Sequence, residues 1–232
     1  MIVVRKSIER GHTQTSWLKS AHTFSFGEYN DPEHRGFSWL RVINDDTVAP
    51  GGGFAPHSHR DMEIITYVLD GALQHQDSLG NGSIIQAGEV QHMSAGTGIR
   101  HSEFNASEKK PVHFLQIWVI PSEVSIPPSY SQKSFPVEGR MGKFQLVVSP
   151  DGRDDSIIVH QDVDIYLTQL TAQDHIGFQI VQGRKLWVHV ARGALLMNGQ
   201  ELFEGDGVAV MDEEKVEFST VKDGEFLLFD LP

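Results

Sequence analysis

Cysteine is absent from the 232-residue chain, and positive charge is scarce. Without cysteine, disulfide bonds, iron–sulfur clusters and thiolate ligands to a metal are all excluded. The 19 lysines and arginines are outnumbered by 31 aspartates and glutamates, which gives a formal net charge of −12. Short basic clusters occur only at Arg5-Lys6, Lys109-Lys110 and Arg184-Lys185. Because binding to phosphates requires clustered positive charge, we expect no direct nucleic-acid partner.

Long apolar runs are also missing. No segment approaches the roughly 18 apolar residues that a membrane-spanning helix needs. The start of the chain, MIVVRKSIERGH, becomes charged at Arg5 and lacks the apolar core of a signal peptide. An apolar content of 39% and a charged content of 22% are typical of globular proteins. We therefore expect a cytoplasmic protein without a membrane partner, and the acidic sequence favours a monomer.

Helical periodicity over long segments is absent, and short extended runs separated by Gly, Asn and Asp fill the chain instead. VHFLQIWVI (112–120) has the composition of a core strand. The dipeptide Asn198-Gly199, which lies between apolar flanks, is a strong hairpin signal. This pattern is typical of β-sandwiches and β-barrels, so the sequence predicts an all-β protein.

Prolines interrupt this pattern in PSEVSIPPSYSQKSFPVEGRMGK (121–143), which predicts a connection across the surface. The two flanking halves share strand and glycine-turn steps, including Gly-Ala-Leu at 71–73 and 193–195, so we expect one fold to occur twice. The predicted divisions are an N-terminal domain at 1–125, a linker at 126–142 and a C-terminal domain at 143–232.

In the stretch GGGFAPHSHRDMEI (51–64), three glycines and a proline precede two histidines that are separated by one residue. Side chains two positions apart share a face on a strand and not on a helix, so His57 and His59 act together only in an extended segment. The run that follows, MEIITYVL (62–69), is rich in Ile, Val, Thr and Tyr and is predicted to be a strand. The pair is therefore a candidate for two ligands of one metal ion.

A second pair of the same kind, His101 and Glu103, follows the glycine-rich stretch AGTG at 95–98. If the two extended segments are neighbours in a sheet, the four side chains face one another and offer three nitrogens and one oxygen. Such a set suits Fe(II), Cu(II), Ni, Mn or Zn. Glu63 is an alternative carboxylate ligand, because it lies four residues after His59 on the same face of the strand. Its other possible role is to orient a ligand imidazole through a hydrogen bond.

The remaining histidines are expected to serve other purposes. Nine of the twelve histidines precede residue 121. Three of them fall in strand-like segments where they can line a pocket, and we expect none to be a ligand: His75, His92 and His113. Others are expected at the surface or in structural hydrogen bonds: His12, His22, His34, His160 and His175.

The histidine pairs lie in longer stretches that resemble the two cupin motifs. The first has the form G-x5-H-x-H-x3-E, with Gly51, His57, His59 and Glu63, and the second contains Gly88, Gly96, His101 and Asn105. Ser94 departs from the second motif, which usually has proline at this place. More narrowly, the resemblance is to the pirin family, through HTFSFGEYNDP (22–32), HSHRDMEIITYVLDG (57–71), MSAGTGIRHSE (93–103) and HQDVDIYL (160–167).

The resemblance implies a bicupin, which consists of two tandem cupin barrels of the double-stranded β-helix or jelly-roll type. It places one mononuclear metal, usually iron, in the N-terminal barrel and implies a degenerate C-terminal barrel without metal. The implied ligands are His57, His59, His101 and Glu103, and for this reason Glu103 is favoured over Glu63.

The resemblance to bacterial pirins also implies an enzyme, a quercetin 2,3-dioxygenase-like oxidoreductase that takes a flavonol and O2. An electron-rich enol could coordinate an open position of the metal, and Glu103, as ligand and nearby carboxylate, could accept the substrate proton as the catalytic base. Aromatic walls for such a substrate could come from four side chains: Phe54, Phe104, Phe114 and Trp118.

Two other functions stay open. Eukaryotic pirins imply a metal-dependent protein-binding and transcriptional co-regulator role without turnover, although the chain has no basic run of the nuclear-localisation type. A metal-dependent isomerase or hydrolase of the broader cupin type is the third function, and only the ligand set argues for it.

Overall fold

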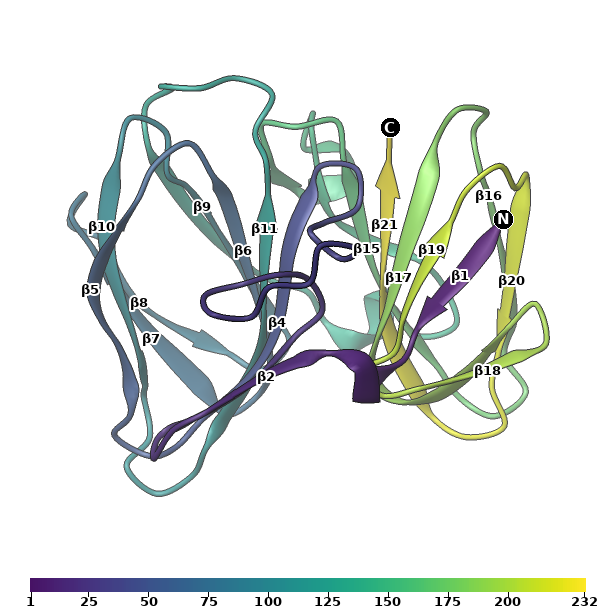
Figure 1. Cartoon of the computed structure of the whole chain (residues 1–232), viewed down its shortest axis with the longest axis horizontal. Helices are drawn as coiled ribbons and strands as arrows, with labels where there is room; N and C mark the ends of the chain where they lie inside the picture. Colours follow the sequence, from purple (N-terminus) through teal and green to yellow (C-terminus); the bar gives the residue numbers. More distant parts are fainter. The chain divides into compact units, whose positions relative to one another are not determined.

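The computed structural model describes all 232 residues, which form 21 β-strands and three short 3-10 helices (Figure 1). The 3-10 helices are η1 (Ser7–Glu9), η2 (Val137–Gly139) and η3 (Arg153–Asp155). None of the helices has the length and apolar character that crossing a membrane requires. The prediction of an all-β protein is confirmed.

Contacts within the chain divide it into two compact units. We call the first unit the N-terminal barrel; it consists of Gly11–Phe135 together with Val159–Gln161. We call the second unit the C-terminal barrel; it consists of Met1–Arg10, Pro136–Ile158 and Asp162–Pro232.

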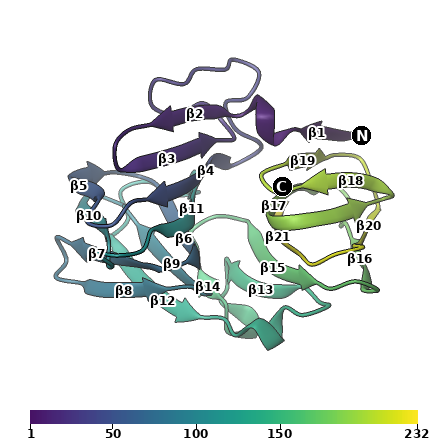
Figure 2. The same cartoon turned by 90° about the horizontal axis from the view of Figure 1, so that it is seen from below.

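The N-terminal barrel contains two sheets (Figure 2). The seven-stranded sheet has the order β12 (Ser129–Ser134), β9 (Glu89–Ser94), β6 (Glu63–Asp70), β11 (Val112–Val119), β4 (Leu40–Val48), β3 (Leu18–His22) and β2 (Gly11–Gln14). The four-stranded sheet has the order β5 (Gly53–His59), β10 (Ile99–Asn105), β7 (Ala72–Asp77) and β8 (Gly82–Gln86). Apolar side chains from both sheets pack into one buried cluster that includes Val48, Val68, Leu73, Ile85 and Phe114. Burial of this cluster stabilises the pairing of the two sheets.

The C-terminal barrel is built from the remaining ten strands. Its main path has the order β1 (Ile2–Arg5), β19 (Gly207–Val210), β17 (Lys185–Met197), β21 (Gly224–Leu231), β15 (Asp164–Leu170), β13 (Gln145–Ser149) and β14 (Ile157–Ile158). The other strands are β16 (His175–Gln179), β18 (Gln200–Phe203) and β20 (Lys215–Ser219). The core contains Phe218 stacked on Phe226, with ring centroids 4.7 Å apart.

Two segments pair with strands that are distant in the sequence. The predicted linker at 126–142 contains β12, which pairs antiparallel with β9 from Ser129 opposite Ser94 to Ser134 opposite Glu89. The first residues of the chain form β1, which pairs antiparallel with β19 in the C-terminal barrel. Neither pairing can be predicted from a short stretch of the sequence, because each depends on a partner strand far along the chain.

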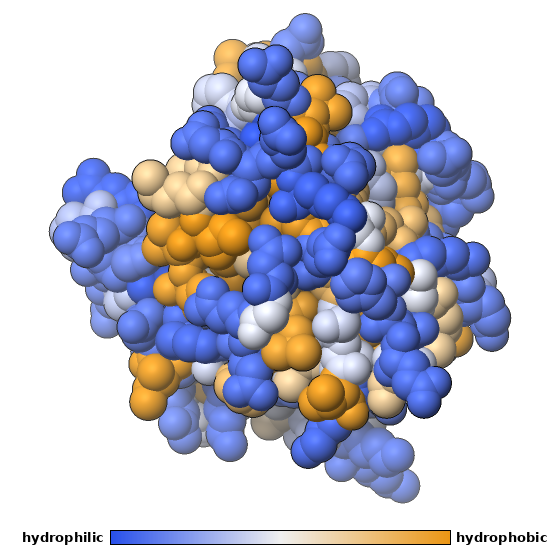
Figure 3. Space-filling view, turned by 90° about the vertical axis from the view of Figure 1, so that its right-hand side faces the viewer, coloured by the Kyte–Doolittle hydropathy of each residue, from blue (hydrophilic) through white to orange (hydrophobic).

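One face of the molecule is shown in Figure 3, where apolar side chains lie among a majority of hydrophilic ones. Exposed apolar residues of the C-terminal barrel include Ile8, Val181, Phe203 and Val221, which come from four different segments of the chain. Single exposed apolar side chains are normal on protein surfaces.

Glu63 connects the segment around His160 to the rest of the N-terminal barrel. Its side chain is fully buried at the start of β6. Oε1 accepts a hydrogen bond from the Ser94 hydroxyl at 2.5 Å, and Oε2 accepts one from His92 Nε2 at 2.7 Å. Oε2 also accepts from the backbone N–H of His160 at 3.1 Å and from its Nδ1 at 3.2 Å. Burial by itself favours the neutral acid, but hydrogen bonds and the charge of His92 lower the pKa of Glu63 to about 2.

We predict that Glu63→Gln destabilises the N-terminal barrel by about 3 kcal/mol at pH 7. Because the pKa of Glu63 is lower in the folded barrel than in the unfolded chain, its ionised form favours folding. This contribution is complete above a pH of about 5 and is lost as the pH falls toward about 2. Urea unfolding followed by tryptophan fluorescence at several pH values measures it. A gap between wild type and variant that stays constant from pH 7 to pH 3 would contradict this account.

Candidate functional site

Strand register brings three histidines together. On β10, His101 lies directly opposite His57 of β5, and Ile99 lies opposite His59. Because His57 and His59 are two residues apart on one strand, both imidazoles point to the face that His101 occupies. The ring centroids are 4.8 Å apart for His57 and His59, 4.5 Å for His57 and His101, and 4.9 Å for His59 and His101. We call these three side chains the histidine cluster.

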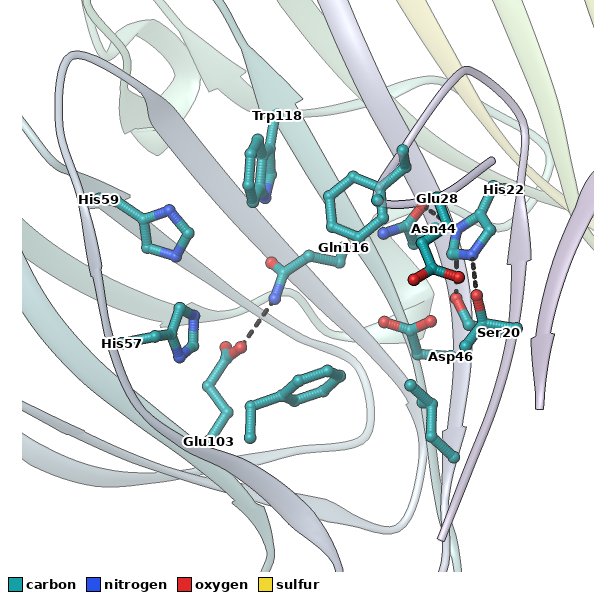
Figure 4. A pocket seen from close by; sticks show the side chains of 15 residues that line it. Ser20, His22, Glu28, Asn44, Asp46, His57, His59, Glu103, Gln116 and Trp118 are labelled. Carbon is teal, nitrogen blue, oxygen red and sulfur yellow. Dashed lines mark hydrogen bonds between the residues drawn. The ribbon is translucent and has the colours of Figure 1, made fainter. Parts of the chain in front are cut away.

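Glu103 follows His101 on β10, after a bulge in the pairing with β5. Its side chain is buried, and Oε2 accepts a hydrogen bond from Gln116 Nε2 at 2.8 Å (Figure 4). Oε1 has no hydrogen-bond partner. Glu103 and His101 offer ligand atoms within 4.8 Å of each other. The structure thus brings all four residues that the sequence singled out to one region of the N-terminal barrel.

His75 joins this region, although the sequence did not identify it as a site residue. It lies on β7 directly opposite Glu103, and its ligand atom is within 4.8 Å of those of His101 and Glu103. Its Nε2 is 3.0 Å from Asp77 Oδ2, and its ring stacks on Tyr130 with centroids 4.8 Å apart. His75 and Asp77 are two residues apart, as are the members of the other two pairs. This spacing could have identified His75 from the sequence.

Burial favours the neutral imidazole at two members of the histidine cluster, His59 and His101. Burial, with the charges of the neighbouring histidines, lowers the pKa of His101 to about 2 and that of His59 to about 4. Burial, with the charge of Asp46, raises the pKa of Glu103 to about 7. At neutral pH the imidazoles of His59 and His101 therefore keep a lone pair that can bind a cation.

The buried donor atoms fit a divalent metal ion. Neither ring nitrogen of His101 has a hydrogen-bond partner, and Oε1 of Glu103 has none. Buried polar atoms without partners are rare and costly, and a metal ion would provide the missing interactions. A cation beside Glu103 would also stabilise its ionised form.

Glu63 lies outside this group of ligand atoms. Both of its oxygens accept hydrogen bonds, from His92, Ser94 and His160. His92 is therefore held by Glu63. His113 instead contacts Asp45, with His113 Nε2 and Asp45 Oδ1 2.7 Å apart.

A cavity of about 320 Å³ opens beside the histidine cluster within the N-terminal barrel. Its walls include His57, His59 and Glu103 at one end and the aromatic rings of Phe54 and Trp118 (Figure 4). The size is within the usual range of sites for small organic molecules. The two other aromatic residues that the sequence suggested as walls lie elsewhere: Phe114 in the apolar core and Phe104 at the surface, where it is 37% exposed.

A row of polar side chains crosses the seven-stranded sheet beneath this cavity. Consecutive strands place them directly opposite one another, in the order His22, Asn44, Gln116, Thr66 and Gln91. We call these five residues the polar row, and all of them are buried. His22 was expected as a surface or hydrogen-bonded residue; it bonds Asn44 Oδ1 through Nδ1 at 2.8 Å and also lines the cavity.

The polar row determines which end of the Gln116 amide faces Glu103. The Thr66 hydroxyl donates to Gln116 Oε1 at 2.9 Å, so the amide nitrogen is left to donate to Glu103. Gln91 Nε2 in turn lies 3.5 Å from Thr66 Oγ1. This chain holds one carboxylate oxygen of Glu103 and leaves the other without a protein partner.

We predict that Gln116→Leu weakens Ni(II) binding by about 10- to 100-fold, because Glu103 loses the donor that orients it. Thr66→Val keeps the side-chain shape but frees the Gln116 amide to rotate, so it should weaken binding in the same direction and by less. Competition with a chelator measures both affinities.

Thr47→Val is the matched control, since Thr47 is on β4 and faces away from Glu103. Unchanged Ni(II) affinity in Gln116→Leu would show that Glu103 does not depend on the polar row.

Comparison with known proteins agrees with the resemblance seen in the motifs. Residues 3–119 match the family model described as Pirin, and residues 146–231 match the model described as Quercetinase C-terminal cupin domain. A quercetin 2,3-dioxygenase of Escherichia coli K12 is 50% identical over 232 residues, which cover 100% of this chain and 99% of the relative. A putative quercetin 2,3-dioxygenase of Pasteurella multocida is 41% identical over 100% of both chains.

A solved structure agrees equally well. The bacterial pirin YhhW from Escherichia coli in complex with nickel(II) superimposes with a TM-score of 0.95 at 49% sequence identity, and the match covers 100% of this chain and 99% of that one. The two barrels are therefore tandem cupin domains, as the motifs implied, and the chain belongs to the pirin family.

Proposed function

We propose that this pirin is a metal-dependent dioxygenase that cleaves a flavonol such as quercetin with O2. The observation that carries the proposal is a cluster of three imidazoles, one of which, His101, lies within 4.8 Å of the buried Glu103 carboxylate, beside a cavity with aromatic walls. The names of relatives that share 41% to 50% of the sequence over full length support the same reaction.

We propose His57, His59, His101 and Glu103 as the residues that hold the metal, and Fe(II) as the metal. Nitrogen and carboxylate donors suit several divalent metals, and the YhhW structure contains nickel(II), so the same residues can be tested with either ion. When bound, the metal supplies a Lewis-acid and redox centre at which an electron-rich enol and O2 can react.

The residues of the cavity position the substrate and move its proton. Glu103 is proposed to hold the metal through Oε1, since Gln116 holds Oε2, and to accept the proton of the flavonol hydroxyl either while bound to the metal or after a shift away from it. Phe54 and Trp118 give the flat aromatic substrate apolar walls and exclude water. Trp118 also packs edge-on against His59, with ring centroids 5.0 Å apart, so this wall restricts the orientation of one proposed ligand.

The test is O2 uptake and CO release when anaerobically iron-loaded protein meets quercetin. We expect turnover that depends on the metal and is lost in His57→Ala, together with most of the bound metal. His113→Ala is the matched control, because His113 contacts Asp45 and lies outside the cavity. That variant should retain both metal and activity.

The opposite result has a clear meaning. About one bound metal per chain without any O2 uptake would exclude the dioxygenase and favour a role in metal-dependent protein binding. Turnover that persists in His57→Ala would show that the reaction does not use the histidine cluster.

A further inference from the structure

Asp46 is a second buried carboxyl group in the wall of the cavity, and the reaction proposed above does not use it. It lies on β4, two residues after Asn44, so both side chains point to the cavity face of the sheet. Asp46 is only 3% exposed, and its Oδ1 has no hydrogen-bond partner. In Figure 4 the carboxyl group lies between Glu103 and the pair formed by Ser20 and His22, away from His59.

The neighbours of Asp46 are held in place by hydrogen bonds among themselves. Ser20 lies directly opposite Asp46 on β3, and its hydroxyl oxygen is 3.4 Å from His22 Nδ1. His22 is bonded on both ring nitrogens, through Nδ1 to Asn44 Oδ1 at 2.8 Å and through Nε2 to Thr13 Oγ1 at 2.8 Å. This end of the cavity is therefore a preformed polar site in which one acceptor atom, Asp46 Oδ1, lacks a donor.

An unsatisfied buried acceptor destabilises the protein, and a ligand that supplies a donor recovers this free energy. Burial also raises the pKa of Asp46 to about 7, so the carboxyl group can accept a hydrogen bond or donate one near neutral pH. A hydroxyl group suits both states because it is donor and acceptor at once. The chemical group that fits this end of the cavity is a phenolic hydroxyl on an aromatic ring that passes Phe54 and Trp118.

We infer that Asp46 determines specificity for polyhydroxylated flavonols, by binding a ring hydroxyl other than the one at the metal centre. The inference rests on the proposed dioxygenase function and names the part of the substrate that the polar end of the cavity recognises. It assigns no proton transfer in the reaction to Asp46.

The experiment compares quercetin with 3-hydroxyflavone, which keeps the enol and the carbonyl but lacks the other hydroxyls. For wild type we expect kcat/KM for quercetin to exceed that for 3-hydroxyflavone. In Asp46→Val the ratio of kcat/KM for quercetin to kcat/KM for 3-hydroxyflavone should fall by about 10- to 100-fold, because any effect of the lost charge on Glu103 acts on both substrates alike. Asp46→Asn keeps an acceptor oxygen and should restore part of the preference.

Asp45→Asn is the matched control, because Asp45 is the next residue on β4 and contacts His113 instead of the cavity. It should leave the preference unchanged. Anaerobic titration of both flavonols against metal-loaded protein, followed by fluorescence quenching, gives the same comparison as dissociation constants without turnover.

The outcomes separate the two proposals. An equal loss for both flavonols in Asp46→Val, or an unchanged preference, overturns the specificity role. Wild-type protein that turns over neither flavonol but binds quercetin in an Asp46-dependent way contradicts the dioxygenase and keeps the binding site. Wild-type protein that binds neither flavonol overturns both.

Discussion

The antiparallel register of β10 against its two neighbours is the constraint on which the site depends. It places His101 opposite His57 on one side, and on the other side it places Glu103 opposite His75. A slip of one residue would turn His101 and Glu103 to the opposite face of the sheet. The strand pairing in this sheet thus holds the donor atoms in place in advance, which would reduce the entropy lost when a metal binds.

The opposite sheet supplies the polarity of the cavity. Its interior face carries the polar row, whose side chains form hydrogen bonds across the strands in two groups: His22 with Asn44, and Gln116 with Thr66 and Gln91. Hydrogen bonding of this kind avoids much of the cost of burying polar groups. Gln116, in the middle of the row, reaches Glu103 beside the histidine cluster, and Asp46, a neighbour of the row on β4, presents an unpaired oxygen at the other end of the cavity.

Local patterns in the sequence predicted much of this site, because residues two apart on a strand share a face whatever the rest of the fold does. His57, His59, His101 and Glu103 could be found in this way, but the pattern also admitted Glu63, and only the resemblance to pirins favoured Glu103 over it. The contribution of His75 depends on which strand lies beside β10, and the bonding of Glu63 to His92 depends on the pairing of β6 with β9. Phe54 lines the cavity and Phe114 lies in the buried core, and this difference likewise required knowledge of which strand face meets the core. Long-range pairing of this kind leaves no trace in a short stretch of residues.

The central claim is that the histidine cluster and Glu103 form one metal-binding site. X-ray absorption of nickel- or iron-loaded protein, combined with anomalous diffraction, tests it most directly. The account predicts a single site with nitrogen from His57, His59 and His101 and oxygen from Glu103, at distances of about 2.0–2.2 Å. A site that uses His75 in place of His57, or a metal without a carboxylate ligand, would contradict it.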